Sequence, residues 1–167
     1  MIQNALIIIK PDGVSKGLMG AVFNKFAKAN LELVGLKIVK AEVEEAEKHY
    51  HHLRDKPYFQ ETVRYLVGEF HKKKELIVIV YHGKDAIKKC RKIAGATNPE
   101  KAHPESIRGA YGRITTKGLY ENVVHVSSDL REAEREVKLW FRPDDLTKHL
   151  YPTRTKIFNQ VKIKVWI

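Results

Sequence analysis

The sequence predicts an α+β fold in which helices pack on one antiparallel sheet. Four apolar runs have the length and the bounding turns of strands, and amphipathic stretches with helical period separate them. Their order along the chain is β-α-β-(αα)-β-α-loop-β-α. Without the extra helical hairpin and the long loop before the last core strand, this is the ferredoxin-like βαββαβ sandwich. Since the length suits one core, we expect residues 1–167 to form a single domain.

The first half of the chain supplies two strands and three helices. The run "ALIIIK" at 5–10 indicates a central strand, and "PDGV" after it indicates a turn. Residues 17–29 carry apolar side chains at helical spacing, whereas 31–43 alternate as a second strand does. Residues 44–54 and 57–69 indicate a helical hairpin, because a proline interrupts the helical pattern between them.

The second half repeats the pattern around a long connection. The run "ELIVIVY" at 75–81 is apolar enough for a central strand, and 83–95 indicate a helix between two glycines. Residues 95–119 show no clear period, and ordered loops of that length are usually functional. We expect the fourth strand at "NVVHV", 122–126, and a helix with one apolar stripe at 129–141.

The last residues, "VKIKVWI" at 161–167, alternate apolar and mostly basic side chains. This pattern indicates a two-faced strand. It could close an edge of its own sheet or lie against another subunit, and both readings stay open.

Charge and cysteine content restrict the function classes. Lys and Arg number 31 against 20 Asp and Glu, and the net charge of +11 attracts nucleic acid, phosphorylated metabolites or an anionic membrane. The single Cys90 rules out an intramolecular disulfide framework and fits a reducing compartment. No apolar run is long enough for a signal sequence or a membrane span, so we expect a cytoplasmic protein with no membrane partner.

Two segments carry groups suited to phosphate. Lys10 in "KPDGV" stands where a strand ends, as a fixed cation for phosphate or, more often for such a position, as a solvated lysine. The loop segment offers Arg91, Thr97 and Arg108, and guanidinium groups match phosphate oxygens bidentately. Neither the P-loop pattern nor G-x-G-x-x-G occurs, so any nucleotide binds by another device.

The segment "HYHHLRDKPYF" at 49–59 concentrates histidine and aromatic residues. His49 and His52 are three apart and could share a helix face that holds a metal, although no thiol or carboxylate nearby completes the site. Tyr50, Arg54 and Tyr58 fit a nucleotide pocket better, with a hydroxyl, a cation and a ring for stacking. A polar helix with packed aromatics explains the segment equally well.

His125 ends an apolar strand, where a lone histidine is more often structural than catalytic. Its neighbours favour catalysis: Asn122 and Ser127 can hydrogen-bond a ligand, and Glu136 can reach inward from the flank of the next helix. A carboxylate bonded to one ring N–H leaves the other nitrogen as a neutral nucleophile. Asp129 is expected to cap that helix.

Taken in order, these segments closely resemble the nucleoside diphosphate kinase family. The resemblance runs from about Ala5 to Pro143, leaving 144–167 outside it, and rests on "KPDGV", "HYHHLRDKPYF", "AGATNP", "IRG", "NVVH" and "AEREVKLWF". It implies a phosphotransferase that moves the γ-phosphate of ATP or another nucleoside triphosphate to a nucleoside diphosphate, by a ping-pong route through a phosphohistidine. It also implies Mg²⁺ carried by the nucleotide phosphates, with no metal held by the protein, and a homo-hexamer or tetramer.

The resemblance assigns a role to each candidate residue. His125 falls on the nucleophile, Glu136 on the carboxylate that orients it, and Ser127 on the serine beside it. Lys10 and Tyr50 fall on the contacts with the γ-phosphate. The nucleotide-binding positions, with Arg54 close by, fall on Tyr58 and Leu119 at the base, Asn122 at the sugar, and Arg91, Thr97 and Arg108 at the phosphates.

The chain departs from the family pattern near its centre. Val126 replaces a small residue and could crowd the strand end, and the acid that follows stands one place later, at Asp129. Ala110 stands where an acidic residue is common, and 112–121 are longer than usual, which affects the Leu119 assignment. None of these changes removes a reacting group, so we expect the protein to be active.

Two other readings remain. A basic nucleic-acid-binding protein on this fold would bind in a salt-dependent way without needing His125. RNA-recognition modules, however, show aromatic residues on their middle strands, and only Tyr81 stands near one here. A silent family relative would have lost the nucleophile or the cations, and this chain keeps them. Nucleic-acid binding is therefore expected as a secondary property at most.

Overall fold

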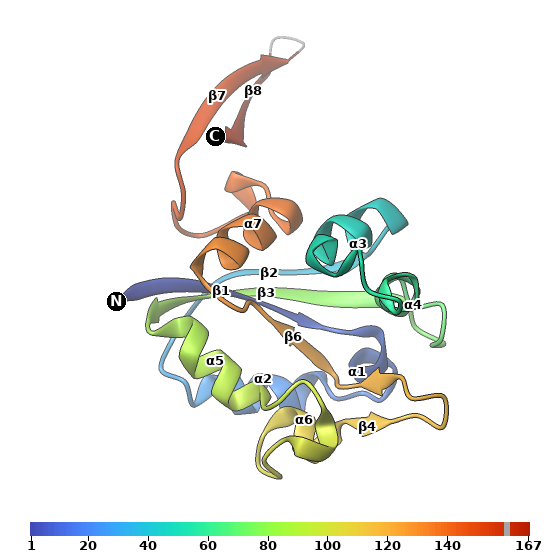
Figure 1. Cartoon of the computed structure of the whole chain (residues 1–167). Coiled ribbons are helices and arrows are strands. Elements are labelled where there is room, and N and C mark those ends of the chain that lie inside the picture. Colours follow the sequence, from blue (N-terminus) through green and yellow to red (C-terminus); the bar gives the residue numbers. More distant parts are fainter. Residues whose placement is uncertain (159–160) are drawn as a thin grey trace.

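The computed structural model, which describes residues 1–158 and 161–167, contains the predicted antiparallel sheet (Figure 1). Its strand order is β2-β3-β1-β6. The core strands are β1 (Ile2–Ile9), β2 (Glu32–Lys40), β3 (Glu75–Lys84) and β6 (Val124–Val126). The sheet, with its helices, confirms the ferredoxin-like prediction.

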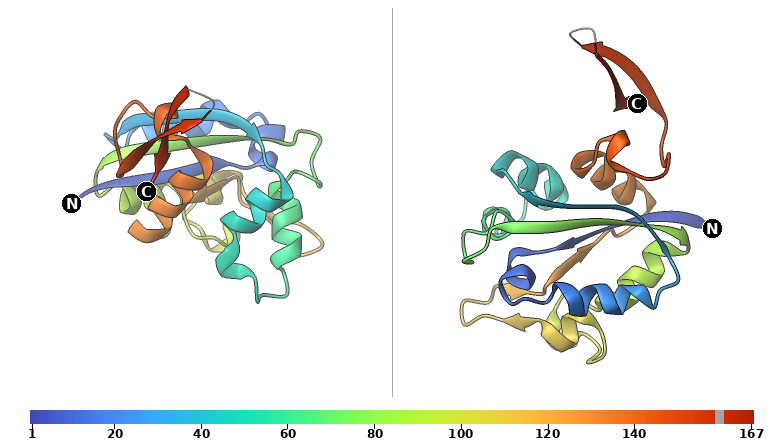
Figure 2. Two further views of the ribbon diagram at one scale, coloured as in Figure 1. Left: turned by 90° about the horizontal axis from the view of Figure 1, so that it is seen from above. Right: turned by 180° about the vertical axis from the view of Figure 1, so that it is seen from behind.

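Helices cover both faces of the sheet. Figures 1 and 2 show α2 (Met19–Ala27) and α5 (Ala86–Ala94) on one face, and α3 (Val43–His49), α4 (Phe59–Leu66) and α7 (Leu130–Trp140) toward the other. Strand β1 separates two apolar cores, because Ile7 and Ile9 pack on the first side and Leu6 and Ile8 on the second. All four side chains are fully buried, as the apolar run predicted.

Several short elements differ from the sequence predictions. The "PDGV" segment forms a one-turn helix α1 (Pro11–Ser15) with Pro11 at its start, where a turn was predicted. The long loop contains η2 (Pro99–Lys101), α6 (Ile107–Tyr111), β4 (Arg113–Ile114) and β5 (Tyr120–Glu121). Each is too short to give a readable period, which is why the sequence indicated only a loop.

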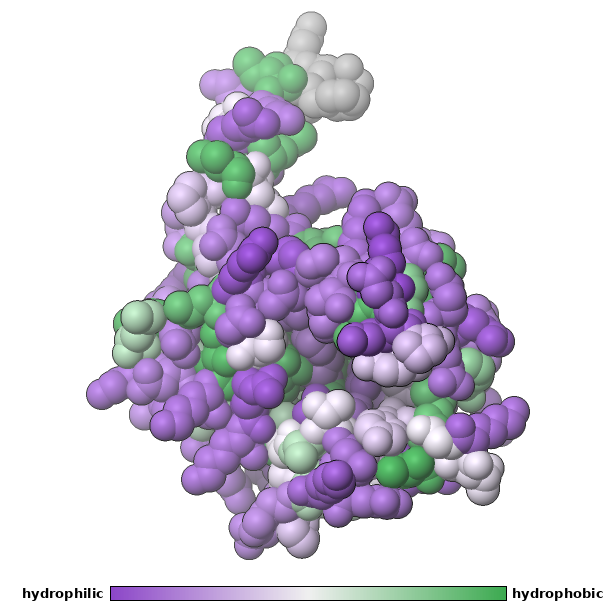
Figure 3. Space-filling view, viewed as in Figure 1, coloured by the Kyte–Doolittle hydropathy of each residue, from purple (hydrophilic) through white to green (hydrophobic). Residues whose placement is uncertain are grey.

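The strand predicted at the C-terminus is present, but its pairing partner differs from the sequence prediction. Strand β8 (Val161–Trp166) forms, but it pairs with β7 (Thr153–Phe158) in a separate hairpin, so the prediction that it could close the main sheet is wrong. The hairpin projects from the body, with apolar and charged side chains along it (Figures 1 and 3). At its base Trp166 Nε1 donates to the carbonyl oxygen of Phe141 at 2.8 Å. After α7 the chain passes through η3 (Pro143–Asp145).

In the part of the chain that the structure describes, the helices are all too short or too polar to cross a membrane.

Candidate active site

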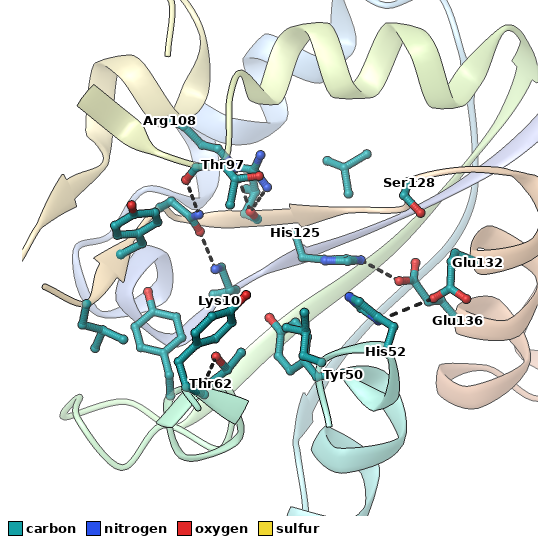
Figure 4. Close-up of a pocket in the computed structure, with 18 of the residues that line it drawn as sticks. Lys10, Tyr50, His52, Thr62, Thr97, Arg108, His125, Ser128, Glu132 and Glu136 are labelled. Carbon is teal, nitrogen blue, oxygen red and sulfur yellow. Dashed lines mark hydrogen bonds and ion pairs between the residues drawn. The ribbon is translucent and has the colours of Figure 1, made fainter. Parts of the chain in front are cut away.

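A cavity of about 830 Å³ opens beside the end of β6 and receives residues from both halves of the chain (Figure 4). It brings together nearly all the predicted site residues: Lys10, Tyr50, Tyr58, Arg91, Thr97, Arg108, Leu119, Asn122, His125 and Glu136. Ser127 is fully buried just behind the lining. Arg54 is exposed and does not line the cavity, so its expected place close to the phosphates stays a prediction.

His125 is oriented by a carboxylate from the adjacent helix. Its Nε2 lies 2.9 Å from Glu136 Oε1, and Ser127 Oγ donates to Glu136 Oε2 at 2.5 Å. Ser127 Oγ in turn accepts the backbone N–H of Leu6 at 3.1 Å, which ties the group to β1. The carboxylate accepts a hydrogen bond from Nε2–H, so we assign the tautomer protonated at Nε2, which leaves a free lone pair on Nδ1.

Val123, the residue before β6, has an unusual backbone conformation. Val123 adopts φ 68°, a left-handed conformation that costs a β-branched residue about 1–3 kcal/mol. Its N–H donates to Asp12 Oδ2 at 2.9 Å, and its carbonyl accepts the N–H of Lys10 at 2.8 Å. These bonds hold the bend that separates Asn122 from β6, so the strand begins at Val124, two residues later than predicted.

Lys10 is a buried cation at the centre of the pocket. Its Nζ donates to Asn122 Oδ1 and lies 4.9 Å from the centroid of the Tyr65 ring. Burial lowers its pKa to about 8, since desolvation penalises the charged form. Asn122 Nδ2 donates to the carbonyl of Thr97 at 2.8 Å. This bond links Lys10 and Asn122 to the loop at 95–119, which also carries Arg108.

Arg108 is fixed by backbone carbonyl groups. Its Nη2 donates to Val124 at 2.9 Å and its Nη1 to Gly95 at 2.8 Å. Ser106 caps α6 by accepting the N–H of Gly109 at 3.1 Å, which sets the start of the helix that carries Arg108. Burial lowers the pKa of Arg108 to about 10, so the guanidinium remains charged at neutral pH.

The outer end of the pocket has an aromatic residue on one side and a hairpin turn that carries Leu119 on the other. Tyr58 immediately precedes α4 and is 49% exposed. Residues 112–121, the segment that is longer than usual in the family, fold as a hairpin. In it the Thr115 N–H donates to the Leu119 carbonyl at 2.9 Å, and Gly118 adopts φ 81° in the turn. This hairpin brings Leu119 into the lining, as expected.

The departures from the family pattern are accommodated. Val126 is 4% exposed, pairs with Ile7 of β1 and joins the core, so β6 continues past His125. Asp129 caps α7 by accepting the N–H of Glu132 at 2.9 Å, which confirms the predicted cap.

Sequence reasoning missed part of the lining. Thr62 and Tyr65 stand four and seven residues after Tyr58, a helical spacing that could have revealed them. His52, Tyr120 and Glu132 carried no such signal. The metal reading of His49 with His52 is wrong, because α3 ends at His49, whose ring is buried against Trp140, while His52 lies on the separate turn η1 (His51–Leu53).

Comparison with known proteins points to one family. A family model described as nucleoside diphosphate kinase matches residues 3–146. The nucleoside diphosphate kinase of Thermococcus kodakarensis is 41% identical over 148 residues, covering 89% of this chain and 82% of that protein. The one from Brugia malayi is 36% identical over 157 residues, covering 94% and 97%.

Solved structures extend the likeness to the fold. The Halobacterium salinarum nucleoside diphosphate kinase in complex with CDP has a TM-score of 0.79 at 32% identity, covering 89% of this chain and 93% of that one. The Borrelia burgdorferi enzyme with bound vanadate and ADP, a transition state mimic, has a TM-score of 0.78 at 28% identity, covering 89% and 92%. These matches do not favour the nucleic-acid-binding alternative. The chain belongs to the nucleoside diphosphate kinase family of phosphotransferases.

Proposed function

We propose that the chain moves the γ-phosphoryl group of ATP or another nucleoside triphosphate to a nucleoside diphosphate through a phosphohistidine on His125. One observation carries this proposal. Glu136 occupies Nε2 of His125, so the remaining nucleophilic atom of the ring, Nδ1, belongs to a pocket that also contains Lys10, Arg91 and Arg108.

The reaction balances as two displacements at phosphorus. In the first, the Nδ1 lone pair of His125 bonds to the γ-phosphorus while the bond to the β–γ bridging oxygen breaks. The diphosphate leaves with that electron pair, and Nε2 keeps its proton. The phosphorylated ring carries positive charge, which the carboxylate of Glu136 stabilises. In the second, an oxygen of another nucleoside diphosphate takes the phosphoryl group, and the imidazole returns to its neutral form.

Charge stabilisation would come from groups already in place. Lys10, Arg91 and Arg108 neutralise charge on the moving phosphoryl group without reorganising, which is the main protein contribution to phosphoryl transfer. Tyr50 adds a hydroxyl donor. Burial raises the pKa of Tyr50 above its ordinary value, so the hydroxyl keeps its proton at neutral pH.

Nucleoside binding follows from the outer pocket. Tyr58 would stack on one face of the base and Leu119 would contact the other, while Asn122 and Thr97 would bind the sugar and phosphates. Because every base has a flat face, this arrangement favours broad nucleoside specificity.

Mg²⁺ is proposed to enter on the nucleotide. It would supply additional positive charge to the nucleotide phosphates. The pocket fits an ion carried by the phosphates, because the carboxylates of Asp129 and Glu136 in the lining are each already hydrogen-bonded to protein groups. The lining therefore does not require a carboxylate cage around the metal.

Phosphoenzyme formation tests the route. Incubation with γ-labelled ATP and no acceptor should yield an acid-labile, alkali-stable phosphoprotein that any nucleoside diphosphate discharges. His125→Ala should remain unlabelled, and His103→Ala, which changes an exposed histidine outside the pocket, should label normally. Equal labelling of the wild type and His125→Ala would reject the proposal.

Self-association is proposed on a separate observation. Strand β2 is an edge of the main sheet, and its Leu36 and Ile38 are 50% and 69% exposed. An unpaired edge with apolar side chains is prone to pairing with a second copy. We expect a homo-hexamer, with a tetramer as the alternative. Light scattering should show Ile38→Lys shifting the wild-type assembly toward smaller species, and a monomeric wild type would contradict the proposal.

The remaining proposals concern the chain as a whole. The tail contacts the body, since Thr147 N–H donates to the Val34 carbonyl at 2.9 Å, and this supports one domain over residues 1–167. A single cooperative melting transition would support it, and two separate transitions would contradict it.

The buried thiol of Cys90 is compatible with the proposed cytoplasmic location, which fractionation of cells would test.

A further inference from the structure

The histidines of "HYHHLRD" divide into two environments. His49 is fully buried, and its Nδ1 accepts the indole N–H of Trp140 at 3.2 Å. His51 and His52 are exposed on η1, and His52 reaches the pocket lining (Figure 4). There it faces Glu132 of α7, and the proposed phosphoryl transfer uses neither of them.

We propose that His51, His52 and Glu132 bind one divalent transition-metal ion, such as Zn²⁺, Ni²⁺ or Co²⁺, at the rim of the nucleotide pocket. The three side chains each offer a ligand atom, and these atoms lie within 4.8 Å of one another. This site would be separate from the Mg²⁺ that accompanies the nucleotide, and it departs from the expectation that the protein itself holds no metal.

The spacing between His52 and Glu132 suits an ion better than a direct bond. His52 Nδ1 lies 3.9 Å from Glu132 Oε2, which is too long for a hydrogen bond. Two ligands on a tetrahedral Zn²⁺ lie about 3.3 Å apart, given metal–ligand bonds of about 2.0–2.1 Å. A small rotation of these partly exposed side chains closes that difference.

Arg135 already holds the two halves of the site together. Its Nη2 donates to Glu132 Oε2 at 2.7 Å and to the carbonyl of His49 at 2.9 Å, while Nη1 donates to the carbonyl of Lys48 at 2.7 Å. The Glu132 carboxylate is therefore fixed relative to the segment that leads into His51 and His52. Carboxylates that ligate metals are commonly hydrogen-bonded in this way by a second residue.

The ligand set selects the class of metal. Two imidazoles and one carboxylate suit Zn²⁺, Ni²⁺ and Co²⁺, whereas Mg²⁺ prefers oxygen ligands in octahedral geometry. Three protein ligands leave one position on a tetrahedral ion for water or an anion from the pocket.

Calorimetry on the full chain in excess Mg²⁺ tests the site. Titration with Zn²⁺ should show one ion per chain for the wild type, and Co²⁺ should give the visible absorption of a tetrahedral complex. His51→Ala and His52→Ala should each weaken binding tenfold or more. His149→Ala, an exposed histidine elsewhere, should bind as the wild type does. Zn²⁺ should raise the melting temperature of the wild type but barely that of His52→Ala.

A second triad makes the experiment decisive. His49, His125 and Glu136 also lie close enough together to ligate an ion. Loss of Zn²⁺ binding in His125→Ala with normal binding in His51→Ala would move the ion to that triad and overturn the proposal. Unchanged affinity in both His51→Ala and His52→Ala would overturn it as well. Normal phosphorylation of His125 in His51→Ala would show that the variant is folded, and would separate this outcome from failure of the proposed function.

Discussion

Asp12 accepts the backbone N–H of Val123 across 111 residues of sequence, and this bond fixes a strained residue beside the catalytic strand. The carboxylate of Asp12 is fully buried, and Val123 is held at φ 68° between Asn122 and β6. Such conformations persist only where the surroundings determine them, and they concentrate at functional sites. The bond therefore connects helix α1 to the orientation of both Asn122 and His125.

Removing the acceptor should release this strain at the expense of the site. Asp12→Ala leaves the buried N–H of Val123 without a partner, which should cost about 1–3 kcal/mol of the free energy of unfolding. We expect Asp12→Ala to lower kcat/KM at least tenfold, because Asn122 and His125 lose their fixed positions. Asp12→Asn retains an acceptor oxygen and should recover much of the activity. Denaturant unfolding and steady-state kinetics check both, and full activity in Asp12→Ala would refute the role of the bend.

Glu136→Gln should impair the nucleophile without removing it. The amide can accept from Nε2 of His125 but carries no charge to stabilise the phosphorylated ring. We expect phosphoenzyme formation to slow by about 10²–10⁴-fold, the range associated with a positioned acid–base group. Rapid-quench labelling measures this rate directly. Ser127→Ala leaves the carboxylate of Glu136 in place and removes the hydroxyl that steadies it, so it should slow phosphorylation less than Glu136→Gln does. A larger effect of Ser127→Ala would contradict the orienting role of Glu136.

The loss of charge on Lys10 should make the activity of the enzyme fall at alkaline pH. With a pKa of about 8, Lys10 is mostly protonated at pH 7 and loses its charge as the pH rises through 8. Phosphate binding should weaken over the same range, so kcat/KM for ATP should fall above pH 8. Carbon-13 NMR of the lysine side chains, with Lys10→Met to identify the signal, measures the titration itself. A Lys10 resonance that titrates near the ordinary 10.5 would contradict this prediction.

The same shift has a consequence for stability. The folded pKa lies below the ordinary value of 10.5, so between about pH 8 and 10.5 the unfolded chain binds more protons at this site than the folded chain does. The contribution of Lys10 to the free energy of unfolding should therefore increase as the pH rises across that window. Lys10→Met should lack this component in urea unfolding series collected at matched pH values.

Tyr58 should contribute equally to all nucleosides. Loss of one base–aromatic stack costs about 1–3 kcal/mol, so Tyr58→Ala should weaken nucleotide binding by roughly 5–150-fold. Tyr58→Phe keeps the ring and should bind as the wild type does. Calorimetric titration of His125→Ala carrying each change, with ADP, GDP and CDP, isolates binding from turnover. A loss confined to one base would show that Tyr58 reads base identity instead.

The sequence predicted the parts of this protein that repeat a local pattern. The buried run of β1 and the apolar stripe of α7 were readable because their periods extend over many residues. The helix α6 was missed because five residues cannot display a period. Strand β6 was predicted two residues too long, since nothing in "NVVHV" reveals that Val123 adopts a left-handed conformation.

The site residues that lie within recognisable motifs could be predicted from the sequence. Lys10, Arg108 and His125 received their roles from the resemblance of the ordered segments to the family. The bond between Asp12 and Val123 and the position of His52 opposite Glu132 depend on tertiary packing, which one sequence does not encode locally. The hairpin of β7 and β8 was half predicted for the same reason, because an alternating strand does not specify its partner.

The contact between Ser127 and Leu6 predicts how phosphorylation is lost on heating. Through Ser127 Oγ, the group formed by His125 and Glu136 is joined to β1, the strand that separates the two cores. The phosphoryl acceptor consequently belongs to the same cooperative unit as the core and cannot open by local unfolding. Heat should therefore abolish phosphorylation at the temperature where the whole domain melts, without an earlier inactive but folded state.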